Sequence, residues 1–294
     1  MADSSSSDSE AGPMRELARR GDLCCINTGT LGFREPIAVS ARRIAAQGFG
    51  HITPWRQEID EDHPERAAAA IREQGLSVAA YCRTAYFTAD DPTGRRAAID
   101  DNRKALEAAA VLGAPVLVAV VGGLSPHSKD IAGCRQQILD GLAALLPTMQ
   151  ATGVRIALEP LHPFYAADRS LLNTLAQALD WCERLDSRQG GWFGVAVDAY
   201  HVWWDPDLMP SIARAGKRIL ALHVCDWLRE TRDPLQDRGM MGDGVVDLRR
   251  LRAAVEAAGY RGPVEVEIFS KLDWWTRNPD EVLATCRERL FSLC

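Results

Sequence analysis

Four short apolar runs in the second half of the chain each end on an ionisable residue. The runs cover 155–159, 194–198, 219–223 and 264–267, and they close on Glu159, Asp198, His223 and Glu267. Runs of Val, Ile, Leu and Ala with these lengths predict buried strands of a parallel sheet. Because side chains alternate along a strand, each terminal residue shares its face with the residue two places before it. The parity therefore predicts that all four polar side chains lie on the inner face, at one edge of the sheet.

This set of side chains predicts a metal site. Three carboxylates in a partly dry pocket raise one another's pKa unless a cation neutralises them. We therefore expect Glu159, Asp198, His223 and Glu267 to bind one divalent metal ion. Three oxygen ligands and one imidazole suit Mn²⁺, which we take first, and also Mg²⁺, Co²⁺ or Zn²⁺. Glu265 has the same parity as Glu267, and we expect it one layer deeper, in a buried ion pair with Arg155.

The four runs are the last of eight candidate strands, at 23–28, 50–53, 77–81, 116–121, 155–159, 194–198, 219–223 and 264–267. Amphipathic segments alternate with them, at 35–47, 64–74, 93–112, 129–151, 170–185, 207–216, 247–258 and 279–291. Eight such units in roughly 270 residues match an α/β protein of the (β/α)8 TIM barrel type. We expect a single barrel domain over 14–294, preceded by a disordered Ser- and acid-rich tail over 1–13. The alternative, a doubly wound sheet, lacks its GxGxxG turn after the first strand.

Composition and charge exclude several classes of protein. With 47% hydrophobic and 25% charged residues over 294 positions, the chain has the composition of a globular protein rather than of a disordered or fibrous one. Its formal charge of −6 argues against nucleic acid or an anionic membrane as a partner. We find no apolar stretch of roughly 20 residues and no secretion signal, so we expect a cytoplasmic location.

Several motifs resemble the sugar phosphate isomerase/epimerase superfamily of xylose isomerase-like barrels, and they come closest to those of 2-keto-myo-inositol isomerase. The motifs are LEP at 158–160, D-x-x-H at 198–201, H-x-x-D at 223–226, DRGMMGDG at 237–244 and VEVEIF at 264–269. The resemblance covers nearly the whole chain and implies that the four strand-end residues are metal ligands. It further implies that His201 and Arg238 contact substrate oxygens, and that a proton moves through a metal-bound enediolate.

The function expected is isomerisation or epimerisation of a keto sugar or an inosose, in which Glu159 and Glu267 take and return the proton. The alternative is a metal-dependent lyase or dehydratase, because an enolate beside a leaving oxygen eliminates. A sugar-binding barrel without catalysis would not need the four ionisable residues. A nuclease like endonuclease IV would need further histidines, and the strand at 77–81 has none.

Other side chains near the strand ends are candidates for substrate contacts. Indole faces suit the C–H faces of sugar or cyclitol rings, so we expect Trp55 and Trp204 to contact substrate. Asp226, His162 and Lys271 follow predicted strand ends and are expected at the rim of the site. The loops after the last two strands have no Gly-rich nest backed by a lysine pair, which disfavours phosphorylated substrates. The additional tryptophans also suit a subunit contact, as in a homodimer or homotetramer.

Overall fold

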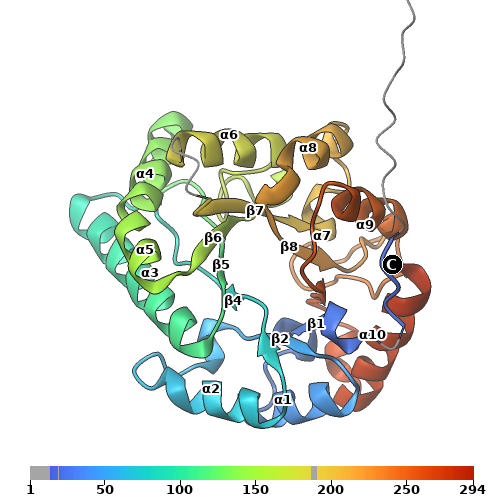
Figure 1. Cartoon of the computed structure of the whole chain (residues 1–294). Coiled ribbons are helices and arrows are strands. Elements are labelled where there is room, and N and C mark those ends of the chain that lie inside the picture. The colour runs from blue at the N-terminus through green and yellow to red at the C-terminus, as the bar shows by residue number, and fades with distance from the viewer. Residues whose placement is uncertain (1–13, 19, 187–190) are drawn as a thin grey trace, which may run out of the picture.

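The computed structural model describes residues 14–18, 20–186 and 191–294 as a nine-stranded parallel sheet rolled into a barrel inside a ring of helices (Figure 1). The strands are β1 (Cys24–Asn27), β2 (His51–Thr53), β3 (Ser77–Val78), β4 (Tyr81–Cys82), β5 (Val116–Ala119), β6 (Arg155–Leu158), β7 (Phe193–Asp198), β8 (Ile219–Val224) and β9 (Val264–Val266). The predicted α/β barrel is confirmed. The tail predicted over 1–13 lies outside the described residues.

One predicted strand is divided in two. β3 and β4 are the two halves of the strand predicted over 77–81, and they form the two ends of the sheet order β3-β2-β1-β9-β8-β7-β6-β5-β4. β3 pairs with β2, whereas β4 pairs with β5. A parallel bridge from Trp55, just after β2, to Cys82 of β4 joins the two ends. Eight strand positions therefore close the barrel, as the unit count predicted.

The helices alternate with the strands as expected. They are α1 (Ile37–Ala46), α2 (Pro64–Glu73), α3 (Pro92–Leu112), α4 (Ile131–Ala144), α5 (Leu146–Thr152), α6 (Leu175–Leu185), α7 (Ala199–Val202), α8 (Leu208–Ala215), α9 (Leu248–Ala257) and α10 (Pro279–Leu293). The single helix predicted over 129–151 is two helices, because Pro147 lacks the N–H that would continue the first one. Among the described residues, no helix combines the length and the apolar character needed to cross a bilayer.

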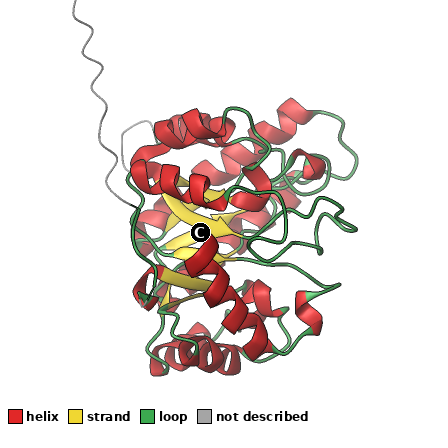
Figure 2. Ribbon diagram, turned by 90° about the vertical axis from the view of Figure 1, so that its right-hand side faces the viewer, coloured by secondary structure: helices red, strands yellow, loops and turns green. Residues whose placement is uncertain are grey.

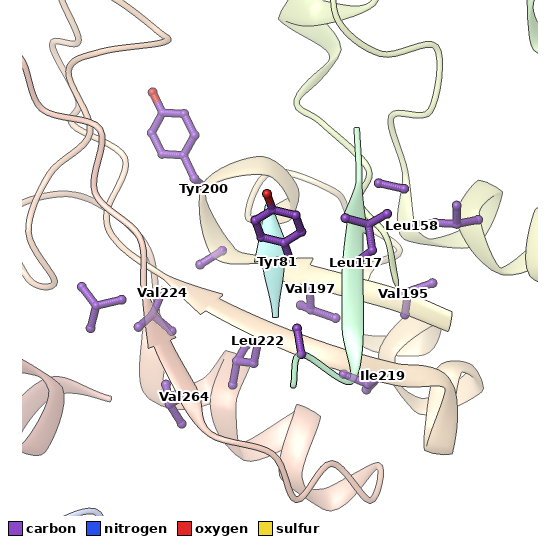
Figure 3. Packing of buried hydrophobic residues seen from close by; sticks show 14 of the residues in the cluster. Tyr81, Leu117, Leu158, Val195, Val197, Tyr200, Ile219, Leu222, Val224 and Val264 are labelled. Carbon is purple, nitrogen blue, oxygen red and sulfur yellow. The ribbon is translucent and has the colours of Figure 1, made fainter. Parts of the chain in front are cut away.

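Alternate residues of the strands face the barrel interior and the helix layer. Ala157, Ala196 and Ala221 belong to the inner apolar cluster. Their neighbours pack outward in the main core, where Figure 3 shows Leu158, Val195, Val197 and Leu222. Alanines occupy little of the interior, which leaves volume at the mouth for longer polar side chains.

Leu220 departs from the predicted parity. The predicted alternation along 219–223 puts Ala221 and His223 on the inner face and so implies that Leu220 faces the helices, but Leu220 packs against the inner cluster. Val195 pairs with Ile219 while Ala196 pairs with Ala221, so β8 carries one extra residue, Leu220, in a bulge. The bulge restores the predicted parity beyond it, because Asp198 and His223 are direct partners in the register.

Long loops follow the strands at the end of the barrel where their carboxyl ends lie. Figure 2 shows the extended loops gathered at one end of the barrel. Two of the longest cover 159–174, between β6 and α6, and 225–247, between β8 and α9. Loops at this end carry the chemistry of (β/α)8 proteins.

Candidate metal centre and substrate cavity

Four adjacent strands bring the predicted ligands to one point. Glu159 follows β6, Asp198 ends β7, His223 lies near the end of β8 and Glu267 follows β9. One ligand atom from each residue lies within 4.8 Å of the other three, and all four side chains are buried. The backbone N–H groups of Glu159 and Glu267 donate to Ala119 (3.1 Å) and Val224 (3.2 Å), so the sheet ladder continues through both positions. Strand geometry therefore holds both carboxylates in place.

The electrostatics of these residues fit a bound cation. Burial raises the pKa of Asp198 to about 6, although Arg238 opposes the shift. Burial also raises the pKa of Glu267, against the opposing charges of Arg238 and His223. Burial lowers the pKa of His223, but the carboxylates of Glu265, Glu159 and Glu267 outweigh it and raise the pKa well above its usual value. A divalent ion would remove the repulsion among these carboxylates and would bind the neutral imidazole.

The surroundings of His223 test more directly than the pKa shifts whether a metal ion fits this cluster. Its Nδ1 lies 3.1 Å from Oε1 of Glu159 and 3.8 Å from Oε2 of Glu267, so this nitrogen faces the carboxylate cluster. Its Nε2 is buried and has no hydrogen-bond partner among the described residues, and the nearest carboxylate oxygen, Oε1 of Glu265, is 3.6 Å away. Three carboxylate oxygens and one imidazole nitrogen form a donor set that suits Mn²⁺, Zn²⁺, Co²⁺ or Mg²⁺.

A second polar layer, below the cluster, contains Glu265. Asn27 of β1 donates from Nδ2 to Oε1 of Glu265 (2.8 Å) and to Oε1 of Glu267 (2.9 Å). Thr53 of β2 donates to Oε2 of Glu265 at 2.7 Å. The depth predicted for Glu265 is confirmed, but the predicted ion pair with Arg155 is wrong. Arg155 lines a separate cavity at the opposite end of the barrel, so neutral donors from β1 and β2 satisfy Glu265 instead.

Arg238 enters the site from the loop over 225–247 and contacts two of the ligands. Its Nη1 donates to Oε2 of Glu267 (2.9 Å) and to Oδ2 of Asp198 (3.1 Å). Its Nη2 lies 3.2 Å from Nε2 of His201. The guanidinium also lies 4.4 Å above the Tyr200 ring centroid. Burial and the charge of Arg238 lower the pKa of His201 well below its usual value, so His201 is neutral.

Two buried aspartates hold the Arg238 loop in place. Asp226 accepts from the backbone N–H groups of Trp227, Gly242 and Val246, each at 2.9 Å. Asp237 accepts from both the backbone and the guanidinium of Arg232. A backbone bond from Arg238 to Phe269 (2.9 Å) joins the loop to the segment after β9. The H-x-x-D and DRGMMGDG motifs thus position Arg238 rather than forming a flexible turn.

A cavity of about 370 Å³ opens above the cluster. Its lining includes five of the predicted site residues, namely Glu159, Glu267, His201, Arg238 and Trp55. The remaining lining residues are Phe33, Gln57, Arg83, Val120, Leu161, Tyr165, Arg169, Leu235, Gln236, Phe269 and Trp275. Asp198 and His223 lie beneath this lining, fully buried.

Four other predicted substrate contacts lie outside the lining. Asp226 binds the loop backbone, as described above. His162 stacks on Trp227 with ring centroids 4.7 Å apart, and Trp204 packs against the edge of His162 at 5.7 Å. Lys271 is exposed on the surface. In this structure His162 and Trp204 support the rim, and Lys271 does not reach the cavity.

Of the aromatic wall of the cavity, sequence reasoning predicted Trp55 and missed the other three rings, and it also missed Asn27, the hydrogen-bond partner of Glu265 and Glu267. Phe33, Trp55, Phe269 and Trp275 form a chain of ring contacts with centroid distances of 5.3–6.2 Å. Phe33 has a left-handed backbone, with φ 57°, which is uncommon for a residue other than glycine. No local pattern marks Phe33, and the motif VEVEIF at 264–269 contains Phe269 without indicating that its ring lines the cavity. Asn27 had a weaker signal, since it lies one residue before the end of the first predicted strand, at 23–28, and is the last residue of the observed strand β1.

Comparison with known proteins places the chain among related barrels. A family model described as the xylose isomerase-like TIM barrel matches residues 41–288. L-ribulose-5-phosphate 3-epimerase UlaE of Salmonella paratyphi A is 25% identical over 238 residues, which cover 78% of each chain.

Solved structures agree with this assignment. Protein SMc04130 of Sinorhizobium meliloti 1021 is 49% identical, with a TM-score of 0.90 over 94% of this chain and 99% of that one. The IolI protein, crystallised with a zinc atom, is 20% identical with a TM-score of 0.78 over 92% and 97% of the chains. At 23% identity, 3-keto-D-glucoside 4-epimerase YcjR of E. coli has a TM-score of 0.71 over 92% and 98%. The IolI protein and YcjR thus share the fold of this chain. Because the family model matches most of its length, the chain belongs to the xylose isomerase-like TIM barrel family.

Proposed function

We propose that the protein is a divalent-metal-dependent isomerase or epimerase that moves a proton next to the carbonyl group of a keto sugar or an inosose. The observation that carries the proposal is the buried cluster of Glu159, Asp198, His223 and Glu267 beneath a substrate-sized cavity. The epimerase activity of the UlaE relative supports an enzyme of the sugar isomerase and epimerase class.

Two carboxylates are placed to exchange protons with a bound substrate. Glu159 and Glu267 line the cavity, whereas Asp198 lies below it. A bound divalent ion would polarise the substrate carbonyl and stabilise the negative charge that develops on its oxygen. Asn27 and Arg238 each donate to Glu267, so they orient this carboxylate and hold its negative charge. Burial of Glu267 moves its pKa toward the range that suits a general base.

The cavity walls suit a polyol. Trp55, Phe33, Phe269 and Trp275 offer apolar ring faces for C–H groups, and Gln57, Gln236 and His201 offer polar groups for hydroxyls. The zinc atom bound to IolI, a structural neighbour, supports a divalent ion in this barrel type. We keep Mn²⁺ as the first candidate and Zn²⁺, Co²⁺ and Mg²⁺ as the alternatives.

The test is exchange of the substrate α-proton with solvent deuterium, followed by NMR on a panel of keto sugars and inososes with each metal ion. Glu159→Gln and Glu267→Gln should each abolish the exchange that the wild type shows. Glu107→Gln, an exposed residue on α3, is the matched control and should keep it. Full exchange in either cavity variant would remove that carboxylate from the mechanism. An unsaturated ketone as product would assign elimination instead.

A further inference from the structure

We propose that Arg83 and Arg169 form a binding site for an anionic group of the substrate, either a carboxylate or a phosphate. The inference rests on the proposed function, and it narrows the substrate class to acidic or phosphorylated keto sugars. Both arginines line the same cavity as Glu159 and Glu267. One molecule in this cavity could therefore reach the reacting carboxylates and the arginine pair together.

Neither guanidinium has a carboxylate partner. Among the described residues, no acidic oxygen lies within 4.0 Å of Arg83 or Arg169, whereas Arg238 in the same cavity pairs with Asp198 and Glu267. Glu61 and Asp101, which line a neighbouring cavity together with Arg83, already pair with Arg56 at 2.7 Å each. The two arginines therefore provide positive charge that the protein itself leaves unpaired.

Aromatic rings and carbonyl groups hold the pair instead. The Arg83 guanidinium lies 4.7 Å from the Tyr86 ring centroid and donates to the Thr84 carbonyl at 3.1 Å. The Arg169 guanidinium lies 5.7 Å from the Tyr165 ring centroid. Nη2 of Arg83 also donates to the Tyr86 hydroxyl at 3.4 Å, so each terminal nitrogen of Arg83 uses one of its two N–H groups within the protein and keeps the second for a ligand. Stacking of this kind fixes the plane of a guanidinium, which prepares it for contact with an oxyanion.

Arg83 also has an unused donor. Its Nε is buried and has no hydrogen-bond partner among the residues that the structure describes. Burial lowers the pKa of Arg83, and the positive charge of Arg169, which lines the same cavity, acts in the same direction, whereas Tyr86 and Glu159 oppose the shift. Buried donors without a partner are uncommon and costly in native proteins. An anion between the arginines would satisfy the donor and offset the repulsion between the two positive charges.

The backbone holds both arginines in position before any ligand binds. Next to Arg83, Thr84 donates from its backbone N–H to Val118 (3.0 Å) and from its hydroxyl to Val120 (3.1 Å). The carbonyl of Arg169 accepts from Gly122 at 3.0 Å. Gly122 has φ +105°, and a Cβ there would lie 2.9 Å from Cβ of Tyr86, the ring under Arg83. Since glycine allows this close approach, the two loops form a preorganised site. The absence of a Gly-rich phosphate nest led us to expect unphosphorylated substrates, but a pair of arginines can bind a phosphate without such a nest.

The experiment compares substrates that share one keto-sugar skeleton and differ in the group at C6, which is a hydroxyl, a phosphate or a carboxylate. We would measure kcat/KM for α-proton exchange with D-fructose, D-fructose 6-phosphate and D-fructuronate, and with the corresponding tagatose series. The wild type should favour one anionic form over the neutral sugar by roughly 10- to 100-fold, the size expected for a charged hydrogen-bonded pair. The preferred form identifies the anion as phosphate or carboxylate.

Arg83→Gln and Arg169→Gln should each reduce this preference by about tenfold or more. Arg66→Gln, which removes one exposed charge on α2, should leave the preference unchanged. Calorimetric titration with inorganic phosphate and with acetate gives a readout that needs no turnover: at least one anion should bind to the wild type and more weakly to both variants. Exchange with equal rates on neutral and anionic sugars, or a preference that both variants retain, would overturn the inference and leave the proposed function standing. Anion binding that depends on both arginines, without α-proton exchange on any sugar, would support the anion site and count against the proposed function.

Discussion

Replacing Arg238 by glutamine should tighten metal binding while slowing turnover. Nη1 of Arg238 lies 2.9 Å from Glu267 and 3.1 Å from Asp198, so the guanidinium stands beside two of the expected ligands. With metal–oxygen distances of about 2.1 Å, an ion on these oxygens would be at most about 5 Å from Nη1. At an effective dielectric constant near 20, that repulsion is about 3 kcal/mol per unit of ion charge. Taking one unit as the lower bound, the Kd for metal should fall roughly 100-fold.

Competition with a chelator at pH 8 measures this change, because Asp198, with a pKa of about 6, is ionised there. Arg238→Lys, which keeps the charge, is the matched control and should retain a Kd within about tenfold of the wild type. Without metal, Arg238→Gln removes the ion-pair partner that Asp198 and Glu267 share and should lower the free energy of unfolding by about 3–5 kcal/mol. A folded Arg238→Gln protein whose Kd is unchanged or weaker would refute the reasoning.

Three further predictions follow from the polar layers. Asn27→Asp removes a hydrogen-bond donor from Glu267 and adds a negative charge beside it, which should raise the pKa of Glu267. The acid limb of the pH–rate profile should therefore move to higher pH. Superimposable profiles of the variant and the wild type would count against the role of Asn27 in holding the charge of Glu267. Metal affinity measured by calorimetry should weaken by up to about tenfold per pH unit below pH 6. Burial raises the pKa of Asp198 to about 6, and its proton must leave before a metal binds. A metal affinity that does not change between pH 7 and pH 5 would contradict the metal role of Asp198. In the metal-free protein, Glu265→Gln should lower the pKa of His223, because the negative charge of Glu265 raises it. An NMR titration of His223 that is the same in the variant and the wild type would disprove this interaction between Glu265 and His223.

The position of the buried cluster of ionisable side chains could be predicted because it depends on local rules. Strand parity and the position of the strand ends determine where Glu159, Asp198, His223 and Glu267 lie, and both are visible in short apolar runs. The exception, Leu220, lies in a bulge, and a single extra residue in one strand leaves no mark in the alternation of a run this short.

The cavity walls could not be predicted in the same way. Arg83, Arg169 and Phe33 lie in loops whose paths depend on contacts with distant segments, such as the bond between Gly122 and Arg169. His162 and Lys271 follow strand ends as closely as the true lining residues do, yet the loops carry their side chains away from the cavity. Distance along the chain from a strand end therefore predicts the four residues of the buried cluster better than it predicts the lining of the cavity.

The central claim, that this cluster binds a metal, is tested most directly by elemental analysis of protein purified without chelator. The wild type should contain about one equivalent of Mn, Zn, Co or Mg, and His223→Ala and Glu267→Gln should lose it. Glu107→Gln should retain the wild-type content. A wild type that holds no metal even after supplementation with each ion would contradict the account.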